Sequence, residues 1–599
     1  MMTQHTLRAD FLVAGGGMAG LCAALAAARN GATVVLVQDR SVLGGNASSE
    51  VKMHIVGADV HGGRPGRRES GIIEELKLED AARNAHRSYS QWDLLLYEKV
   101  KAEPNITLLL DADLYAAETM VDGAGRPVIR SARVVRHLME EEWHISATFF
   151  ADCTGDGRLG AEAGADFHIG RESRDDYGES LAQPVADRQT LGSSILFTGR
   201  KYDTPQPFRA PDWVRKFGAA DFKHRPIHSY EYGYWWFEWG GQLDSIKDNE
   251  AIRHELLRIA LGVWDYVKNS GEHPDAACWA LDWVGSVPAK RESRRFLGPH
   301  VLTQADVQGG TVFADQVAYG GWAIDLHPPS GVDVPDEPPF TPFHVASLYS
   351  IPLRCYHSRN VANLFFAGRN ISATHVAFAS TRVMATCALG GQAIGTAAAL
   401  WRHATDRDIS NLSTPTAVAE LQDALLRGDA FLLDRAGRDA TDLAPTAEVS
   451  ATSAAPGGEP GKVTDGVTRD LRADFGSWSS DIGHAWESAA LPATLRFEFA
   501  SPVSVGEVHL TFDSGFSREL VLTPSDYVSG KTIRGPQPET VQHYRLRCDD
   551  EVVVDESGNY LRKRIHRIDS KPSVRVVELE VLRTHGLPVA RVFEVRIYP

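Results

Sequence analysis

Cysteine is scarce in this chain and shows no pairing pattern. Six cysteines occur among 599 residues, at positions 22, 153, 278, 355, 387 and 548, and none forms a CxxC pair. This spacing excludes a dithiol redox enzyme and favours free thiols in a reducing compartment. HExxH and clusters of Cys and His at ligand spacing are also missing from the sequence, which therefore predicts no metal site.

Long apolar runs and an excess of positive charge are missing too. No apolar run approaches 18 residues, and the polar start MMTQHTLRAD lacks the features of a signal peptide. The net charge of −16 argues against a nucleic-acid-binding protein or a binder of anionic membranes. We expect a cytoplasmic protein that acts on a small-molecule substrate, with no nucleic acid or membrane as partner; a homo-oligomer is possible.

A glycine-rich loop lies close to the start of the chain. Residues 11–20, FLVAGGGMAG, follow an apolar strand and open an alanine-rich helix, and a second buried strand, ATVVLV, covers residues 32–37. Gly15, Gly17 and Gly20 take the GxGxxG positions, which allow a tight turn, close approach of a pyrophosphate and close helix packing. The loop, with Met18 and Ala19, is therefore predicted to bind a dinucleotide at the helix N-terminus.

The ribose-binding position departs from the usual pattern. The acidic residue that normally ends the second strand is replaced by Gln38, and Asp39 follows it. Either side chain can bind the ribose, and the sequence leaves the choice open. The next segment, SVLGGNASSEV (41–51), resembles the loop that runs beneath the pyrophosphate in FAD proteins of the glutathione-reductase-like superfamily. This resemblance adds Gly44, Gly45, Asn46 and Ser48 to the predicted FAD site; a turn of small residues is the alternative.

Two later segments break from an apolar strand into a polar turn. FFADCTGDG (149–157) contributes Thr154, Gly155 and Asp156, and NLFFAGRNISATH (363–375) contributes Gly368 and Arg369. The helix that follows is rich in Gly and Ala, and its N-terminus would stabilise the negative charge of a reduced flavin. Arg382 lies on the same stretch; a structural salt bridge is the alternative role for either arginine. Residues 363–375 are thus predicted to contact the far end of the same FAD.

Longer motifs make the resemblance more specific. VLGGNASSEVKMHIVGADVHG, ESGIIEEL, ADCTGDG, KRESRRFLGPHVLTQADV, VAYGGWAIDLHPPSG and YSIPLRCYHSRNVANLFFAGRNISATH occur in this order. Over residues 8–405 the chain resembles a bacterial family of FAD-dependent oxidoreductases often found among carbohydrate-degradation genes. The resemblance implies FAD as the cofactor, and it points to a sugar or glycoside as the substrate.

Oxidation of an alcohol needs a base near the reacting hydroxyl, and histidine suits this role because its pKa lies near neutral. We rank three histidines as candidates. His375 follows the Gly-Arg turn, His327 ends an apolar stretch before Pro-Pro, and His61 lies beyond Gly44-Gly45. For each of them, a structural hydrogen bond is the alternative role.

The most aromatic segment, YEYGYWWFEWGGQLD (230–244), reads as a strand with aromatic residues on both faces. Aromatic rings stack on sugar rings, so Tyr234 and Trp236, with Glu238 as a hydrogen-bond acceptor, are predicted to bind substrate. A strand buried in a core is the alternative. Arg291, in the basic segment PAKRESRRFLG, is a further substrate-binding candidate, with a structural ion network as its alternative.

The predicted fold is α/β: a Rossmann-like FAD-binding domain with an inserted α+β substrate domain, plus a C-terminal antiparallel β-sandwich (jelly roll). We assign residues 1–160 and 355–435 to the FAD domain, 161–354 to the substrate domain and 446–599 to the sandwich. The prediction of a sandwich rests on short runs that alternate between apolar and polar residues. This region resembles discoidin, or galactose-binding-like, modules. Its segments WSSD (478–481) and HAW (484–486) are sugar-contact candidates; simple packing against the oxidoreductase is the alternative.

The predicted function is FAD-dependent oxidation of a hydroxyl of a sugar or glycoside. Hydride would pass to flavin N5 with a histidine base, and the electron acceptor is unknown. A second GxGxxG for NAD(P)H is missing from the middle region. Three alternatives stand beside this prediction: glycoside cleavage through transient oxidation and elimination, a carbohydrate-binding protein with a vestigial flavin fold, and an FAD hydroxylase.

Overall fold

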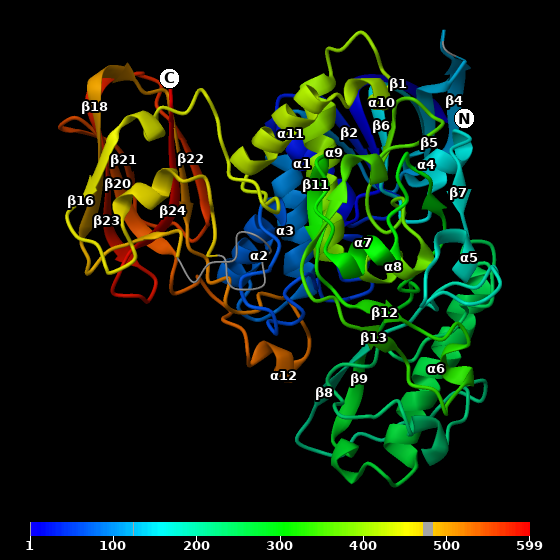
Figure 1. The fold of residues 1–599 in the computed structure, drawn as a ribbon. Coiled ribbons are helices and arrows are strands. Elements are labelled where there is room, and N and C mark those ends of the chain that lie inside the picture. Colours follow the sequence, from blue (N-terminus) through cyan, green and yellow to red (C-terminus); the bar gives the residue numbers. More distant parts are fainter. Residues whose placement is uncertain (1, 124, 471–482) are drawn as a thin grey trace.

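A seven-stranded mixed sheet places the first glycine loop at its centre. The computed structural model describes residues 2–123, 125–470 and 483–599 (Figure 1). The sheet comprises β1 (Thr3–Ala14), β2 (Val34–Val37), β3 (Ile106–Leu109), β4 (Asp113–Val121), β5 (Pro127–Arg136), β6 (Glu141–Asp152) and β15 (Leu364–Phe366). β3, β2, β1, β6 and β15 pair in parallel, whereas β5 is antiparallel to both of its neighbours, β6 and β4. The pairing of β15 with β6 confirms that the distant segment joins this sheet.

Small residues let two helices pack closely beside the sheet. A Cβ on Gly391 of α9 (Met384–Trp401) would lie 2.0 Å from the carbonyl oxygen of Ala19, in α1 (Met18–Arg29). A Cβ on Gly395 would lie 2.1 Å from the carbonyl oxygen of Ala23. The Gly- and Ala-rich composition of α9 is therefore explained by its contact with α1.

Other helices complete this domain. They are α2 (Ile72–Arg83), α3 (Tyr89–Lys101), α4 (Arg158–Glu162), α8 (His375–Thr381), α10 (Ile409–Leu412) and α11 (Pro415–Arg427). Within the described residues no single helix has both the length and the hydropathy of a membrane-spanning helix. The bent pair formed by α8 and α9 has the length and apolar composition of such a helix only when the two are taken together.

The inserted region forms a smaller unit with its own core, drawn at the bottom of Figure 1. The predicted long helix is present as α6 (Asn249–Asn269), beside the paired strands β8 (Phe197–Lys201) and β9 (Trp279–Val284). The region also contains α5 (Arg174–Tyr177), α7 (Gln304–Gly309), β7 (Phe167–His168), β10 (Arg295–Phe296), β11 (Gln316–Gly320), β12 (Ile324–Leu326), β13 (Thr341–Phe343) and β14 (Tyr349–Pro352). Of these, β11 and β14 pair with each other and pack in the core of the FAD domain, where β11 contacts α9.

The prediction of a strand over residues 230–244 is wrong. The segment makes only isolated bridges, at Tyr232 and Trp239, and turns between Tyr234 and Phe237, where the Phe237 amide donates to the Tyr234 carbonyl. Gly233 lies directly against the ring of Phe197, a contact that leaves no room for a side chain. The aromatic rings therefore do not alternate between the two faces of a strand.

The C-terminal region consists of two antiparallel sheets around a separate core. One sheet contains β16 (Glu448–Ala451), β18 (Ala493–Ser504), β23 (Ser573–Thr584), β20 (Val541–Cys548) and β21 (Glu551–Glu556). The other contains β17 (Trp486–Glu487), β24 (Arg591–Tyr598), β19 (Glu507–Phe512) and β22 (Lys563–Arg567). The period-two pattern thus predicted antiparallel sheets correctly. WSSD lies outside the described residues, and Trp486 of HAW is fully buried in the core rather than open to a sugar.

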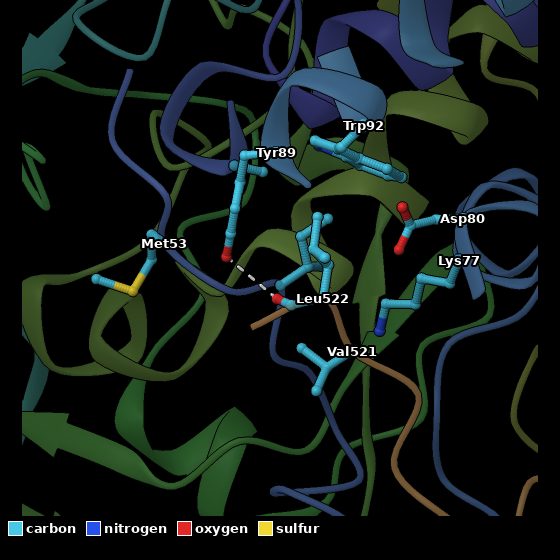
Figure 2. Close-up of a pocket in the computed structure, with 9 residues that line it drawn as sticks. Met53, Lys77, Asp80, Tyr89, Trp92, Val521 and Leu522 are labelled. Atoms are coloured by element: carbon cyan, nitrogen blue, oxygen red, sulfur yellow. Dashed lines mark hydrogen bonds between the residues drawn. The ribbon is translucent and has the colours of Figure 1, made fainter. Parts of the chain in front are cut away.

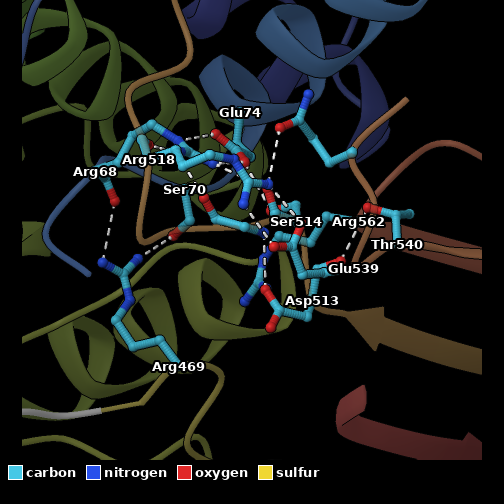
Figure 3. Close-up of polar contacts among 12 residues, drawn as sticks. Arg68, Ser70, Glu74, Arg469, Asp513, Ser514, Arg518, Glu539, Thr540 and Arg562 are labelled. Atoms are coloured by element: carbon cyan, nitrogen blue, oxygen red, sulfur yellow. Dashed lines mark hydrogen bonds and ion pairs between the residues drawn. The ribbon is translucent and has the colours of Figure 1, made fainter. Parts of the chain in front are cut away.

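Buried polar contacts join this sandwich to the FAD domain (Figure 3), and several of them surround an ion pair that lies within the FAD domain. Arg68 donates to both carboxylate oxygens of Glu74, at 2.9 and 2.7 Å, and both side chains are 1% exposed. Ser514 of the sandwich donates to the same carboxylate at 2.7 Å. Arg562 pairs with Asp429 at 3.0 Å, also in a buried setting. Because each charge needs its partner, these contacts hold the two domains in a defined arrangement.

Glu74→Gln should loosen this interface. The substitution leaves Arg68 buried beside a neutral amide, so we expect a loss of about 3 kcal/mol in unfolding free energy. The measurement is the urea midpoint of the first unfolding transition. Glu98→Gln, which removes a surface partner of Arg83, is the matched control and should change stability by less than about 0.5 kcal/mol. Equal midpoints for Glu74→Gln and the control would contradict the assigned role.

Candidate functional site

One cavity of about 730 Å³ extends from the first glycine loop to the inserted unit. Its volume lies in the range of small-molecule and cofactor sites. Most of the predicted cofactor-binding residues line it: Gly15, Gly17, Met18, Ala19, Gln38, Asp39, Gly44, Gly45, Asn46, Thr154, Gly155, Asp156, Gly368, Arg369 and Arg382. Segments that are hundreds of residues apart in sequence therefore meet at one site.

The three glycines of the first loop have different physical roles. Gly15 has φ +97°, and a Cβ there would lie 2.4 Å from the Cys153 carbonyl oxygen. Gly20 does not line the cavity, and its Cβ would lie 1.8 Å from the Gly15 carbonyl oxygen. Gly17 faces open space and is the N-cap of α1, with no side chain bonding the helix amides. These free amides and the helix dipole suit a pyrophosphate.

The structure separates the two ribose candidates. Gln38 is buried; its Oε1 accepts from the Gly16 amide at 2.7 Å and its Nε2 donates to the Val42 carbonyl at 3.2 Å. Its side chain therefore stabilises the first glycine loop by hydrogen bonding and is not free to bind the ribose. Asp39 also lines the cavity and is exposed, which leaves its carboxylate available to ribose hydroxyls.

Ser48 has a structural contact instead of a place in the cavity wall. It is fully buried, and its hydroxyl donates to the Gly45 carbonyl at 2.7 Å.

The basic segment supplies a residue that the sequence prediction left out: Lys290 lines the cavity and pairs with Asp156 at 2.6 Å. Arg369 pairs with the same carboxylate at 3.1 Å, so Asp156 holds two cations at the wall.

His327 lines the cavity with both ring nitrogens occupied. Nδ1 lies 2.5 Å from Glu238 and Nε2 lies 3.1 Å from Asp325, and the side chain is fully buried. Arg382 donates to the same Asp325 oxygen at 3.0 Å. Burial would lower the pKa of His327, but the Glu238 and Asp325 carboxylates raise it above its usual value. Arg382 also lies 2.9 Å from Nε2, so both ring nitrogens are engaged, and the raised pKa favours the protonated form of His327.

His375, the first-ranked candidate, does not line the cavity. Its Nδ1 lies 3.0 Å from Glu292, and its amide donates to Glu172 at 2.8 Å. Arg295 pairs with both of these carboxylates, and the whole group is buried. His375 therefore belongs to an ion network that connects α8 with the inserted region. This is a structural role, the alternative to catalysis named above for this histidine.

His61 lines the cavity and keeps one nitrogen free. Nδ1 lies 3.0 Å from Glu519, whereas Nε2 has no hydrogen-bond partner among the described residues. The side chain is 43% exposed. Its ring packs edge-on against Trp322 at 5.4 Å. His61 and the preceding Val60 have φ of +56° and +48°, a strained backbone of the kind that clusters at functional sites.

The aromatic wall is formed by residues other than those predicted. Tyr234 is buried in the core of the inserted unit and Trp236 packs against that core, and neither lines the cavity. Trp235, Trp322 and Phe340 line it instead. The turn at 234–237 rotates Trp235 towards the cavity, and periodicity could not show this because the segment is not a strand.

Of the remaining substrate candidates, Arg291 lines the cavity and Glu238 does not. Arg291 is in the wall and pairs with Glu238 at 3.1 Å, and Glu238 lies behind His327. Asp325 Oδ1 and Arg382 Nε are buried without a hydrogen-bond partner among the described residues, although both side chains line the cavity. Neither of these two atoms is satisfied by the described residues. Among the described residues no group of three His, Cys, Asp or Glu could hold a metal ion.

Comparison with known proteins gives one extended match. A family model described as FAD dependent oxidoreductase matches residues 10–425. A search of curated proteins finds no match.

Several solved structures match about a quarter of the chain. The family 32 carbohydrate-binding module of C. perfringens NanJ, in complex with galactose, is 14% identical, covering 26% of this chain and 98% of its own, with TM-score 0.19. The Streptococcus pneumoniae EndoD module of the same family is 15% identical over 26% and 98%, with TM-score 0.20. The lectin domain of lectinolysin, complexed with Lewis B antigen, is 12% identical over 27% and 98%, with TM-score 0.19. These scores are too low to carry an argument about function.

Alanine substitutions should separate the roles of two glycines. Gly20→Ala forces Cβ into the Gly15 carbonyl and should lower both stability and flavin content. Gly17→Ala meets no protein atom, so we expect unchanged thermal stability of the flavin-free protein but weaker flavin retention, because Cβ occupies the pyrophosphate's approach. The measurements are the thermal midpoint and the flavin absorbance per protein. Gly461→Ala, also in open space, is the control. If Gly17→Ala retained as much flavin as this control, the assignment of Gly17 to the pyrophosphate site would be wrong.

His327 should make stability depend on pH in one direction. Its pKa is raised in the folded state, so its contribution is complete below about pH 6.5 and is lost as pH rises through the folded-state pKa. Relative to His327→Gln, the wild-type protein should lose about 1.4 kcal/mol per pH unit in that window. Unfolding midpoints between pH 6 and 9 measure this. Parallel profiles for the two proteins would contradict the ion pairing of His327.

Proposed function

Because the chain belongs to the family of FAD-dependent oxidoreductases, we propose that it oxidises a hydroxyl group of a sugar or glycoside. The observation that carries this proposal is the set of residues that lines the cavity of about 730 Å³. It connects a dinucleotide cradle at the α1 N-terminus with a wall that combines aromatic rings and buried polar atoms without partners. The first part suits FAD and the second suits a polyhydroxylated ring.

The residues present fit FAD. The free amides of α1 and the open face of Gly17 would hold the pyrophosphate, and the exposed carboxylate of Asp39 would hold the ribose. Gly368 and Arg369, from beyond β15, line the same cavity and would contact the far end of the cofactor. When bound, FAD supplies the two-electron acceptor for hydride leaving the substrate carbon.

Substrate recognition is assigned to the inner part of the cavity. Trp235, Trp322 and Phe340 offer flat apolar faces for the C–H faces of a sugar ring. Asp325 Oδ1 can accept a hydrogen bond from one hydroxyl, and Arg382 Nε can donate to a neighbouring oxygen. Leaving these buried atoms unpaired costs free energy, so a ligand that pairs them gains affinity and orientation.

We assign the base to His61. Its Nε2 is free in a side chain that lines the cavity, so it can accept the proton of the substrate hydroxyl. Nδ1 faces the Glu519 carboxylate, which would stabilise the imidazolium formed. His327 is unsuited because both of its nitrogens are engaged with carboxylates. Its positive charge instead favours an oxyanion forming on the substrate.

The test is an anaerobic absorption experiment on the flavin-loaded protein with a panel of neutral and acidic glycosides. Bleaching of the oxidised-flavin band by one of them supports the proposal and identifies the substrate class. Cleavage of a glycoside, with recovery of the band in the absence of an acceptor, would indicate transient oxidation and elimination instead. A flavin band that no glycoside bleaches would overturn the sugar assignment.

His61→Asn should slow flavin reduction without loss of flavin. Asparagine tolerates the positive φ at this position but cannot accept the proton as histidine does. We expect the reduction rate constant to fall by about 10²- to 10⁴-fold, measured by stopped flow with the best glycoside of the panel. His86→Gln, on an exposed histidine, is the control. A rate equal to the control would remove His61 as the base.

A further inference from the structure

The loop between β19 and β20 carries part of the sandwich to the edge of the cavity. Glu519, in this loop, faces His61 Nδ1 at 3.0 Å, and its side chain is 10% exposed. The backbone contact is also close, because a Cβ on Gly62 would lie 3.1 Å from the Glu519 amide nitrogen. The carboxylate nearest to His61 therefore comes from a different domain.

The tip of this loop is packed rather than free. Leu520 forms a small buried cluster with Leu78 and Ala81 of α2. Tyr89 donates to the Leu522 carbonyl at 3.2 Å, and Figure 2 shows Val521 and Leu522 among FAD-domain side chains, Met53 included. These side chains line a small pocket, and Met53 lines both this pocket and the main cavity. The loop thus lies directly behind the cavity wall.

The base of the loop is held by charges. Arg68 donates to the carbonyl oxygens of Gly515 and Arg518, and Arg518 pairs with Glu539 within the sandwich. Arg469 donates to the hydroxyl of Ser70 at 2.8 Å, as Figure 3 shows. Arg68 thus ties the start of the loop, next to Glu519, to the FAD domain, and the Arg518–Glu539 pair joins the start of the loop to its end.

We propose that Glu519 is a positioning residue for His61, and that the sandwich thereby completes the active site. A carboxylate at Nδ1 selects the tautomer in which Nδ1 carries the proton and Nε2 keeps its lone pair. When the substrate O–H bond breaks and an Nε2–H bond forms, the imidazolium stays paired with Glu519. The left-handed backbone at His61 needs such external support. This inference rests on the base role proposed for His61.

A double-mutant cycle on the full-length, flavin-loaded protein tests the inference. With the glycoside that reduces the flavin fastest in the panel, Glu519→Gln should lower the rate constant about 10- to 100-fold. KM and flavin content should stay unchanged. In the His61→Asn background the same substitution should have no further effect, because Glu519 acts through His61. Asp526→Asn, which removes the loop's ion pair with Arg87, is the matched control and should keep the wild-type rate.

The outcomes separate this inference from the proposed function. An unchanged rate for Glu519→Gln, or an equal loss with and without His61, would overturn the positioning role while His61 remains the base. An unchanged rate for His61→Asn would overturn the proposed function of His61 itself. Reduction that falls equally in Asp526→Asn would show a general effect of the loop and overturn the assignment to Glu519.

Chemical modification provides a readout that needs no substrate. Diethyl pyrocarbonate reacts with free imidazole nitrogens, and peptide mass mapping counts the additions at His61. We expect one addition in the wild-type protein, at Nε2, because Glu519 holds Nδ1. Glu519→Ala should allow a second addition at the same ring. One addition in both proteins, or two in both, would overturn the inference.

Discussion

Close backbone contact at the first glycine loop is the constraint on which the rest of the structure depends. Gly15 lies against the carbonyl of Cys153 at the end of β6, and α1 lies against α9 with only glycines between the backbones. Side chains at these positions would separate the β1 turn from strands and helices that come from far along the chain. Because these segments touch, the amides of α1, the turn after β6 and the turn after β15 open into one cavity.

Buried charge decides the roles of the polar residues around that cavity. A charge removed from water needs a partner, and two of the three candidate histidines are members of buried ion networks. His375 is held by Glu292, and His327 is held between Glu238 and Asp325. His61 is different because it is half-exposed and has a single partner. Incomplete pairing, rather than proximity to a conspicuous motif, distinguishes a residue that can exchange a proton with a ligand.

The sandwich is an integral part of the molecule. Its loops meet the FAD domain through the buried Arg562–Asp429 pair, the hydrogen bond from Ser514 to Glu74 and a small apolar cluster, and one loop reaches the cavity wall. A module that collects sugars at the end of a flexible linker would need those loops in solvent. Here the loop between β19 and β20 instead packs on α2 through Leu520, and Figure 1 shows this loop beneath α2.

The sequence by itself determined the elements whose pattern is local: the glycine turn with its strands and helix, the amphipathic α6 and the period-two strands of the sandwich. It also identified residues that meet at one cavity, because glycine spacing directly reflects backbone geometry. Only the tertiary structure decided that Trp235 rather than Tyr234 faces the cavity, that Gln38 holds the loop, and that Glu519 faces His61. The last two residues lie 458 positions apart. Such contacts depend on how domains pack, and no local periodicity encodes them.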